Sequence, residues 1–236
     1  MTRLTTIGFD ADDTLWQNEA FFRLTEERFA QLLEGAAPPD HLMQRLLAAE
    51  RRNLGHYGFG IKGFMLSMIE TAVEVTEGRV TGDVIAEILA AGREMLRHPV
   101  ELLPGARETV QALAPEYRVL LITKGDLMDQ ERKLAASGLG DLFHGVEIVS
   151  DKTAPTYARI FARHGTGAKE GLMVGNSLKS DVLPMLAAGG FGVFVPHGLT
   201  WALEAAEMPQ NDPHFAEISE LSVLPGLLHK LLSGTQ

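Results

Sequence analysis

The sequence predicts an α/β protein in which a doubly wound parallel sheet is interrupted by an all-helical insertion. In the second half of the chain, short apolar runs alternate with amphipathic stretches, which is typical of a parallel sheet covered by helices on both faces. A similar apolar run stands near the N-terminus, and a long helical block separates it from the others. We therefore expect an α/β core from residues 1–16 and 98–236 and a helical domain from residues 17–97.

The first strand is expected at residues 4–9, a short and partly β-branched apolar run. From Asn18 to Arg97 the apolar residues recur at spacings of three and four, which indicates helices rather than strands. Thr81 stands where the last of these helices needs an N-cap. The four helices are expected around residues 21–33, 42–47, 64–75 and 84–96.

After Pro99 and Pro104 the pattern changes to alternating strands and helices. Buried strands are expected at residues 118–123, 145–149, 170–174 and 191–195. Amphipathic helices are expected at residues 105–113, 127–137, 153–164 and 178–188. A short strand at residues 215–218 and a helix at residues 224–232 follow. Crossovers between parallel strands are expected to be right-handed.

Composition excludes several classes of protein. With 45% hydrophobic and 22% charged residues, the chain is neither disordered nor fibrous. The net charge of -10 disfavours a nucleic-acid polymer as partner. The absence of cysteine excludes disulfides and thiolate sites and suits the cytoplasm, which is the location we expect. The longest stretch without charged side chains, residues 182–203, is interrupted by proline and glycine, so no membrane span is expected.

Polar side chains follow four of the predicted strands at the point where each strand ends. In parallel sheets of this kind, ligands bind outside the carboxyl ends of the strands, so these side chains are expected to form one site. They are Asp10, Asp12 and Asp13, then Thr123 and Lys124, then Asp151 and Lys152, and finally Asn176, Ser177, Lys179, Ser180 and Asp181.

The chemistry of these groups suits phosphoryl transfer. On an extended chain Asp10 and Asp12 project to the same side, so that one carboxylate can attack phosphorus while the other moves a proton. Thr123 offers a hydroxyl to a phosphoryl oxygen, and Lys152 offers positive charge. Crowded carboxylates need a cation, and hard oxygen ligands suit Mg²⁺.

The segment FDADDTLW, residues 9–16, resembles the first motif, DxDxT, of the haloacid dehalogenase-like (HAD) hydrolase superfamily. LLITKG resembles the second motif, which ends in Thr or Ser, here Thr123, and Lys152 stands where the third-motif lysine is kept. VGNSLKSD resembles the fourth motif, with Asn176 and Asp181 in its acidic places. The four motifs occur in family order over almost the whole chain, and the resemblance implies a Rossmann-like HAD core.

The resemblance implies a magnesium-dependent phosphatase that forms an aspartyl-phosphate intermediate. It assigns Asp10 as the nucleophile and Asp12 as the general acid and then general base. Asp10, the backbone carbonyl of Asp12, and Asp181 would hold Mg²⁺. Asn176, which stands where a carboxylate is common, can contribute an amide oxygen.

The resemblance also implies that the substrate is a small phosphorylated metabolite. Thr123, Lys124 and Lys152 would bind its phosphate, although the superfamily more often has Asn at position 124. The helical insertion resembles the cap that closes over the site and selects the substrate.

Several alternatives stay open at this stage. A phosphosugar mutase and a dehalogenase can be built on the same core, although Asp12 argues against the dehalogenase branch. A non-catalytic, receiver-like phosphate-binding protein is a third reading, against which the helical insertion argues. Asp13 is either a structural hydrogen-bond acceptor or part of the site. Trp16 is either a core aromatic or a substrate platform.

Gly58, Gly60 and Gly63 match the letters of the dinucleotide-binding pattern GxGxxG. The strand that this pattern requires is missing before them, so a link between two helices is expected instead. Three residues of or next to this link, His56, Tyr57 and Phe59, are candidate substrate contacts.

Overall fold

The structure is a computed structural model that describes residues 3–233. It consists of two compact units. The first contains the chain up to Glu19, Val100–Lys124 and the chain from Gln130 onward. The second contains Ala20–Pro99 together with the short segment Gly125–Asp129.

The first unit is built on a parallel sheet. Within residues 3–233, six strands form this sheet in the order β3-β2-β1-β4-β5-β6. Their bounds are β1 (Thr6–Phe9), β2 (Arg118–Lys124), β3 (Gly145–Val149), β4 (Gly171–Gly175), β5 (Phe191–Phe194) and β6 (Phe215–Glu217). The chain order reverses between β1 and β4, and a crevice for ligands opens at such a point beyond the carboxyl ends of the strands.

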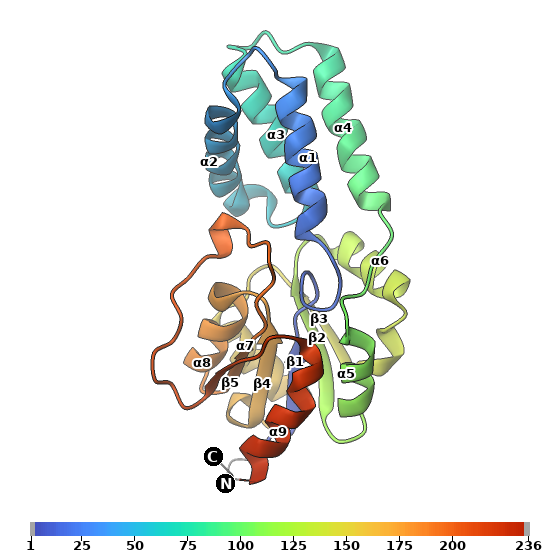
Figure 1. Cartoon of the computed structure of the whole chain (residues 1–236), viewed down its shortest axis with the longest axis vertical. Coiled ribbons are helices and arrows are strands. Elements are labelled where there is room, and N and C mark those ends of the chain that lie inside the picture. Colours follow the sequence, from blue (N-terminus) through green and yellow to red (C-terminus); the bar gives the residue numbers. More distant parts are fainter. Residues whose placement is uncertain (1–2, 234–236) are drawn as a thin grey trace. The chain divides into compact units, whose positions relative to one another are not determined.

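Helices cover both faces of the sheet, as Figure 1 shows. Alternate side chains of β2 point to opposite faces: Val119 and Leu121 pack in the core with α5 and α9, whereas Leu120 and Ile122 pack with α7 and α8. The helices are α5 (Ala106–Leu113), α6 (Leu127–Ser137), α7 (Ala154–His164), α8 (Leu183–Ala187) and α9 (Leu224–Ser233). Short 3₁₀ turns occur at Gly140–Leu142, Ala168–Glu170, Ala202–Glu204 and Leu221–Val223.

This architecture confirms the predicted fold class, a doubly wound α/β sheet with a helical insertion. One predicted helix, residues 178–188, differs. The segment Leu178–Val182 forms a π-helical turn, and α8 begins only after it. Pro184 has no backbone N–H to donate, and the amides of Asp181 and Val182 both bond to the oxygen of Ser177, at 2.9 and 3.2 Å. Asp181 lies within this wider turn.

The helical insertion has an apolar core of its own, to which all four of its helices contribute. The helices are α1 (Glu19–Leu32), α2 (Pro39–Tyr57), α3 (Ile61–Val75) and α4 (Gly82–Arg97). Buried side chains at the centre of this core include Phe29, Leu42, Leu46, Phe64, Met68 and Ile88. The predicted N-cap is confirmed, since the Thr81 hydroxyl accepts a hydrogen bond from the Val84 amide at 3.4 Å.

The GxGxxG letters do not form a dinucleotide-binding turn, because helix α2 precedes them. Gly58 and Gly60 link α2 to α3 with φ of 72° and 111°, values that favour glycine. Gly63 is not part of the link but lies in α3, where an added Cβ would stand 2.9 Å from the Gly58 oxygen. The glycines therefore permit a tight connection between two helices.

None of the helices in residues 3–233 combines the length and the apolar character needed to span a lipid bilayer.

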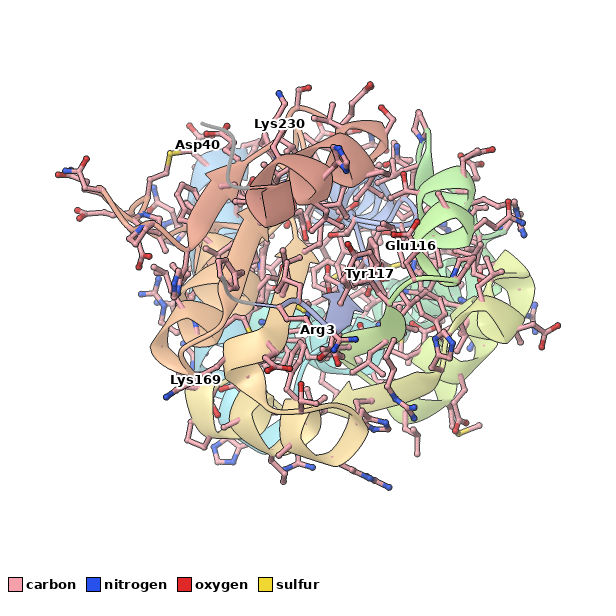
Figure 2. All side chains as sticks on the ribbon, turned by 90° about the horizontal axis from the view of Figure 1, so that it is seen from below. Arg3, Asp40, Glu116, Tyr117, Lys169 and Lys230 are labelled. Atoms are coloured by element: carbon pink, nitrogen blue, oxygen red, sulfur yellow. The ribbon has the colours of Figure 1, made fainter. Side chains whose placement is uncertain are left out.

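The two ends of the sheet differ in character. Figure 2 views the first unit from the end where the strands start, and Arg3, Glu116 and Lys169 lie around that end. Each of these charged residues shortly precedes a strand and is exposed. The polar residues predicted to form the site lie at the opposite end, and several of them are buried.

A substitution at Gly171, the first residue of β4, tests how closely the sheet packs against its helices. An added Cβ at Gly171 would lie 2.3 Å from the ring of Phe161, which is fully buried. We expect Gly171→Ala to destabilise the protein by about 1–3 kcal/mol, because overpacking forces the ring or the strand to shift. Urea unfolding measures the change.

Gly55→Ala is the matched control. Gly55 is exposed within α2 and has no atom within 4 Å of an added Cβ, so this change is expected to stabilise the protein by up to about 1 kcal/mol. If Gly171→Ala were as harmless as Gly55→Ala, the described packing at β4 would be contradicted.

Candidate active site

The loop after β1 curls rather than continuing in an extended conformation. The oxygen of Ala11 accepts hydrogen bonds from the amides of Thr14, Leu15 and Trp16, at 3.3, 2.8 and 3.3 Å. This curl begins after Ala11, so the convergence of the Asp10 and Asp12 carboxylates on one reacting centre stays a prediction. The backbone oxygen of Asp12 is the atom that shares a partner with Asp10, and its carboxylate bonds elsewhere.

Asp10 is buried and held through both carboxylate oxygens. Lys152 donates a short hydrogen bond to Oδ1, and the Thr14 hydroxyl donates to Oδ2 at 3.1 Å. Burial and the nearby carboxylate of Asp181 raise the pKa of Asp10 to about 7, although Lys152 opposes the rise. Asp10 is thus a carboxylate whose ionised form depends on nearby positive charge.

Lys152 joins Asp10 to Asp181, with its Nζ 2.7 Å from Asp181 Oδ1. The side chains of Lys152 and Asp181 are only 2% and 1% exposed. Burial alone would lower the pKa of Lys152, but the two carboxylates raise it, so the ammonium stays charged. The structure thus brings together Asp10, Lys152 and Asp181 from three loops that follow different strands.

The loop after β4 carries Asn176 and Asp181. The backbone amide of Asn176 donates to the Thr14 hydroxyl at 3.0 Å, and this hydrogen bond connects the loop after β4 to the loop after β1. Asp181 Oδ2 accepts from the Ser177 amide at 2.9 Å. A Cβ at Gly175 would lie 2.1 Å from that same oxygen, so glycine is required where the Asp181 carboxylate approaches the strand.

The oxygen atoms around Asn176 fit a magnesium ion. One terminal atom of the Asn176 side chain lies 3.2 Å from Asp10 Oδ2 and 3.2 Å from the Asp12 backbone oxygen. As nitrogen, this atom donates two hydrogen bonds. As oxygen, it joins the Asp10 and Asp12 oxygens in a group of three oxygen ligands that needs a cation. Mg²⁺ prefers oxygen ligands of this kind. Asp181 connects to this group through Lys152.

In the described residues, no three His, Cys, Asp or Glu side chains form a metal-binding group. The fit with Mg²⁺ therefore depends on an amide oxygen and a backbone carbonyl besides the Asp10 carboxylate.

Thr123 and Lys124 end strand β2 but differ in their surroundings. Thr123 is buried, and its hydroxyl has no hydrogen-bond partner in the part of the chain that the structure describes. Lys124 donates to Glu204 Oε1 at 2.5 Å and to the Ser180 hydroxyl at 2.7 Å. The Ser177 and Ser180 hydroxyls also bond to Glu204, at 2.6 and 2.5 Å. Lys124 is expected to bind substrate phosphate, but its positive charge is paired with the Glu204 carboxylate.

The Asp12 carboxylate has three donors that sequence reasoning missed. Trp16 Nε1 and Lys133 Nζ donate to Oδ1 at 2.7 and 2.9 Å, and Gln130 Nε2 donates to Oδ2 at 2.8 Å. Burial alone would raise the pKa of Asp12, but Lys133 and these hydrogen bonds hold it below its ordinary value. The spacing of Gln130 and Lys133, which puts both on one face of α6, is the only signal in the sequence for this arrangement.

Asp13 lies in the loop after β1, with φ of 60°, and α1 begins six residues later at Glu19. Its carboxylate accepts hydrogen bonds from the amides of Asn18 and Glu19, at 2.9 and 3.0 Å, as a helix cap does. Trp16 is a fully buried aromatic that donates to Asp12. His56 and Tyr57 are exposed at the end of α2 in the second unit, and their part in substrate contact stays a prediction.

The fold and this site define a class of α/β enzyme whose centre is a buried carboxylate at the end of the middle strand. The sequence matches the model of the haloacid dehalogenase-like hydrolase family over residues 4–189, and the chain belongs to this family. This confirms the superfamily that the four motifs indicated. A search of curated proteins finds no match.

Solved structures agree with this assignment. A haloacid dehalogenase-like family hydrolase from Xanthomonas campestris is 43% identical, with a TM-score of 0.88, and the match covers 98% of this chain and 93% of that one. YfnB of Bacillus subtilis, described as a HAD-hydrolase bound to magnesium, is 19% identical, with a TM-score of 0.68 and coverage of 96% and 99%. L-2-haloacid dehalogenase from Xanthobacter autotrophicus, with covalently bound chloropropionic acid, is 18% identical, with a TM-score of 0.65 and coverage of 96% and 98%.

The buried ammonium of Lys152 is expected to be essential for stability. Lys152→Met leaves Asp10 and Asp181 buried without compensation, and removing one partner of a buried ion pair typically costs about 3–5 kcal/mol. Urea unfolding without added metal measures this loss. The exposed Lys169 is the control, and Lys169→Met should change stability by less than about 0.5 kcal/mol. Equal stability of the two variants would contradict the described burial.

Glu204 should make stability depend on pH. Burial alone would raise its pKa, but Lys124 and the hydroxyls of Ser177 and Ser180 hold it below the ordinary value. A carboxyl whose pKa is lower in the folded state stabilises the protein above its unfolded pKa, about 4.3, and this contribution is lost as the pH falls through the folded value. Glu204→Gln should therefore lower the urea midpoint near neutral pH, and the difference should shrink below about pH 4.

The exposed Glu207→Gln serves as the control and should show little difference at either pH. A Glu204→Gln difference of the same size at both pH values would show that the charge of Glu204 contributes nothing.

Proposed function

We propose that the protein hydrolyses a small phosphomonoester through a phosphorylated Asp10. The observation that carries the proposal is the setting of Asp10, a buried carboxylate with Lys152 on one oxygen and with Thr14 and Asn176 beside the other. The unpartnered hydroxyl of Thr123, at the end of the neighbouring strand, supports a place for a phosphoryl oxygen. A small phosphorylated metabolite is the partner that we propose.

In the first step an oxygen of Asp10 attacks the phosphorus of the ester. The bond between phosphorus and the ester oxygen breaks, and its electron pair stays on the departing alcohol oxygen. Asp12 is a carboxylate in the free site, so it takes up a proton from water as the anionic ester binds. It then gives that proton to the departing oxygen, so that a neutral alcohol leaves. Lys152 lies beside Asp10 and offsets negative charge as the acyl phosphate forms.

In the second step a water molecule attacks the phosphorus of the acyl phosphate. The Asp12 carboxylate takes a proton from the water, and the bond between phosphorus and Asp10 breaks. Inorganic phosphate leaves and both aspartates return to their starting forms. The three hydrogen bonds that hold Asp12 as a carboxylate support its part as the base in this step.

Asp10, the backbone oxygen of Asp12, Asn176 and Asp181 would hold Mg²⁺, and Asp181 is bonded to Lys152 in this structure. When bound, Mg²⁺ supplies positive charge that offsets the repulsion between a phosphate and the carboxylates. The helical insertion, residues 17–97, would act as a cap that excludes water and selects the substrate.

Phosphate release from a panel of phosphomonoesters, with and without Mg²⁺, tests the proposal. We expect magnesium-dependent release by the wild type and a loss of at least about a thousandfold in Asp10→Asn, because the nucleophile is gone. Asp141→Asn, a change at an exposed aspartate outside the site, should leave release unchanged. The ranking of the esters would identify the substrate class.

Other results would overturn the proposal in distinct ways. Transfer of the phosphoryl group within a sugar phosphate without net release would establish a mutase. Halide release from a 2-haloacid would establish a dehalogenase. Release that survives in Asp10→Asn would show that Asp10 is not the nucleophile.

A further inference from the structure

Two separate sets of side chains hold the two aspartates of the site. Asp10 is held by Lys152, Thr14 and Asn176, as described above. Asp12 is held by residues of other segments: Trp16 at the end of its own loop, and Gln130 and Lys133 of α6. All of these residues belong to the first unit. The donors to the Asp12 carboxylate therefore differ from those to the Asp10 carboxylate, although Asn176 also contacts the Asp12 backbone oxygen.

The donors fix both oxygens of the Asp12 carboxylate. Two N–H groups reach Oδ1 and one reaches Oδ2, from an indole, an ammonium and an amide. A single donor would satisfy one carboxylate oxygen, but three donors spread over both oxygens also fix the rotation of the group. Such a carboxylate is held in one orientation before any substrate arrives.

Lys133 is the centre of this arrangement. Its side chain is 9% exposed, and its Nζ also donates to Asn18 Oδ1 at 2.7 Å. Asn18 in turn donates its amide to Asp13, at the start of α1. Lys133 thus bonds to both ends of the loop from Asp12 to Asn18. A buried ammonium carries a desolvation cost, which its two oxygen partners here offset.

We propose that Lys133, with Gln130 and Trp16, positions Asp12 for proton transfer to the departing alcohol oxygen. This inference rests on the proposed phosphatase function. The three residues act through Asp12 and do not themselves touch the reacting atoms. General acid–base catalysis contributes about 10²–10⁴-fold, and misplacement by about 1 Å can remove a factor of about 10². Their removal should therefore weaken the proton transfer while leaving Asp10 in place.

The leaving group distinguishes this role from a merely structural one. An alkoxide needs a proton as it departs, whereas p-nitrophenolate departs without one. The ratio of kcat/KM for glycerol 3-phosphate to that for p-nitrophenyl phosphate reports proton delivery in the first transfer. It is insensitive to the fraction of folded enzyme, since both esters are measured on the same preparation.

The experiment compares this ratio in the wild type, Lys133→Met and Trp16→Phe, with Mg²⁺ present. Met keeps the length of the Lys133 side chain without its charge, and Phe keeps a ring at position 16 without the N–H donor. We expect the alkyl-to-aryl ratio to fall by at least about tenfold in Lys133→Met and by less in Trp16→Phe, which keeps the Lys133 and Gln130 bonds to Asp12. If Lys133→Met does not fold, the fall of the ratio in Trp16→Phe still tests the proposal.

Glu147→Gln is the matched control. Glu147 is a buried carboxylate that accepts from His164 at 2.6 Å and from Arg163 at 3.1 Å. Its change should lower stability and leave the alkyl-to-aryl ratio at the wild-type value. A fall of the ratio in this variant would show that loss of stability alone accounts for the effect, and it would overturn the proposal.

A second measurement does not depend on activity. The chain has two tryptophans, so its ¹H–¹⁵N spectrum contains two indole signals, and Trp16→Phe identifies that of Trp16. We expect Lys133→Met to move the Trp16 signal, because the indole and Lys133 share one oxygen of Asp12. An unmoved signal would overturn the proposed arrangement.

The outcomes separate this inference from the function on which it rests. If the wild type hydrolyses both esters and Lys133→Met slows both equally, the positioning role is overturned and the phosphatase stands. If the wild type releases phosphate from no ester of the panel with Mg²⁺ present, the phosphatase function is overturned, and with it the role of Lys133 in proton delivery.

Discussion

The arrangement of the site depends on one buried contact, the ammonium of Lys152 between the carboxylates of Asp10 and Asp181. A parallel sheet brings the carboxyl ends of all its strands to one edge, and in this chain acidic side chains follow β1, β3 and β4. Two buried carboxylates repel each other unless a cation stands between them. Because Lys152 follows β3, the outermost strand on that side, the contact also joins loops that follow β1, β3 and β4.

Two other lysines around the site also form ion pairs with carboxylates. Lys124, at the end of β2, is paired with Glu204, and Lys133, on α6, is paired with Asp12. Each lysine comes from a different element and faces a different carboxylate. The acidic residues are thus kept apart and oriented by fixed positive charges, and Asp10 and Asp12 have separate supports. This separation lets two carboxylates in one loop differ in pKa, Asp10 above and Asp12 below the ordinary value.

Much of the fold follows from patterns that are local in the sequence. Apolar runs and helical spacing predict the strands and helices, and parallel pairing then brings Asp10, Thr123, Lys152 and Asn176 to one edge. The sequence does not predict the curl after Asp10, because it depends on Asp13 adopting a positive φ. Glu204 ends a short 3₁₀ turn that no periodic pattern predicts, and Lys133 resembles any polar residue on a helix. Their roles arise from tertiary contacts that no local pattern encodes.

The position of β1 in the sheet has a consequence for how the protein is made. Thr6 of β1 is opposite Arg118 of β2 and Gly171 of β4, so the strand that leads into Asp10 is synthesised long before either neighbour. The helices of the insertion are encoded in between and can pack among themselves while the chain is still growing. During that interval Asp10 lacks both Lys152 and Asp181, and nothing yet requires it to be buried. Assembly of the candidate site is therefore a late event in biosynthesis, completed only when the loop after β4 has left the ribosome.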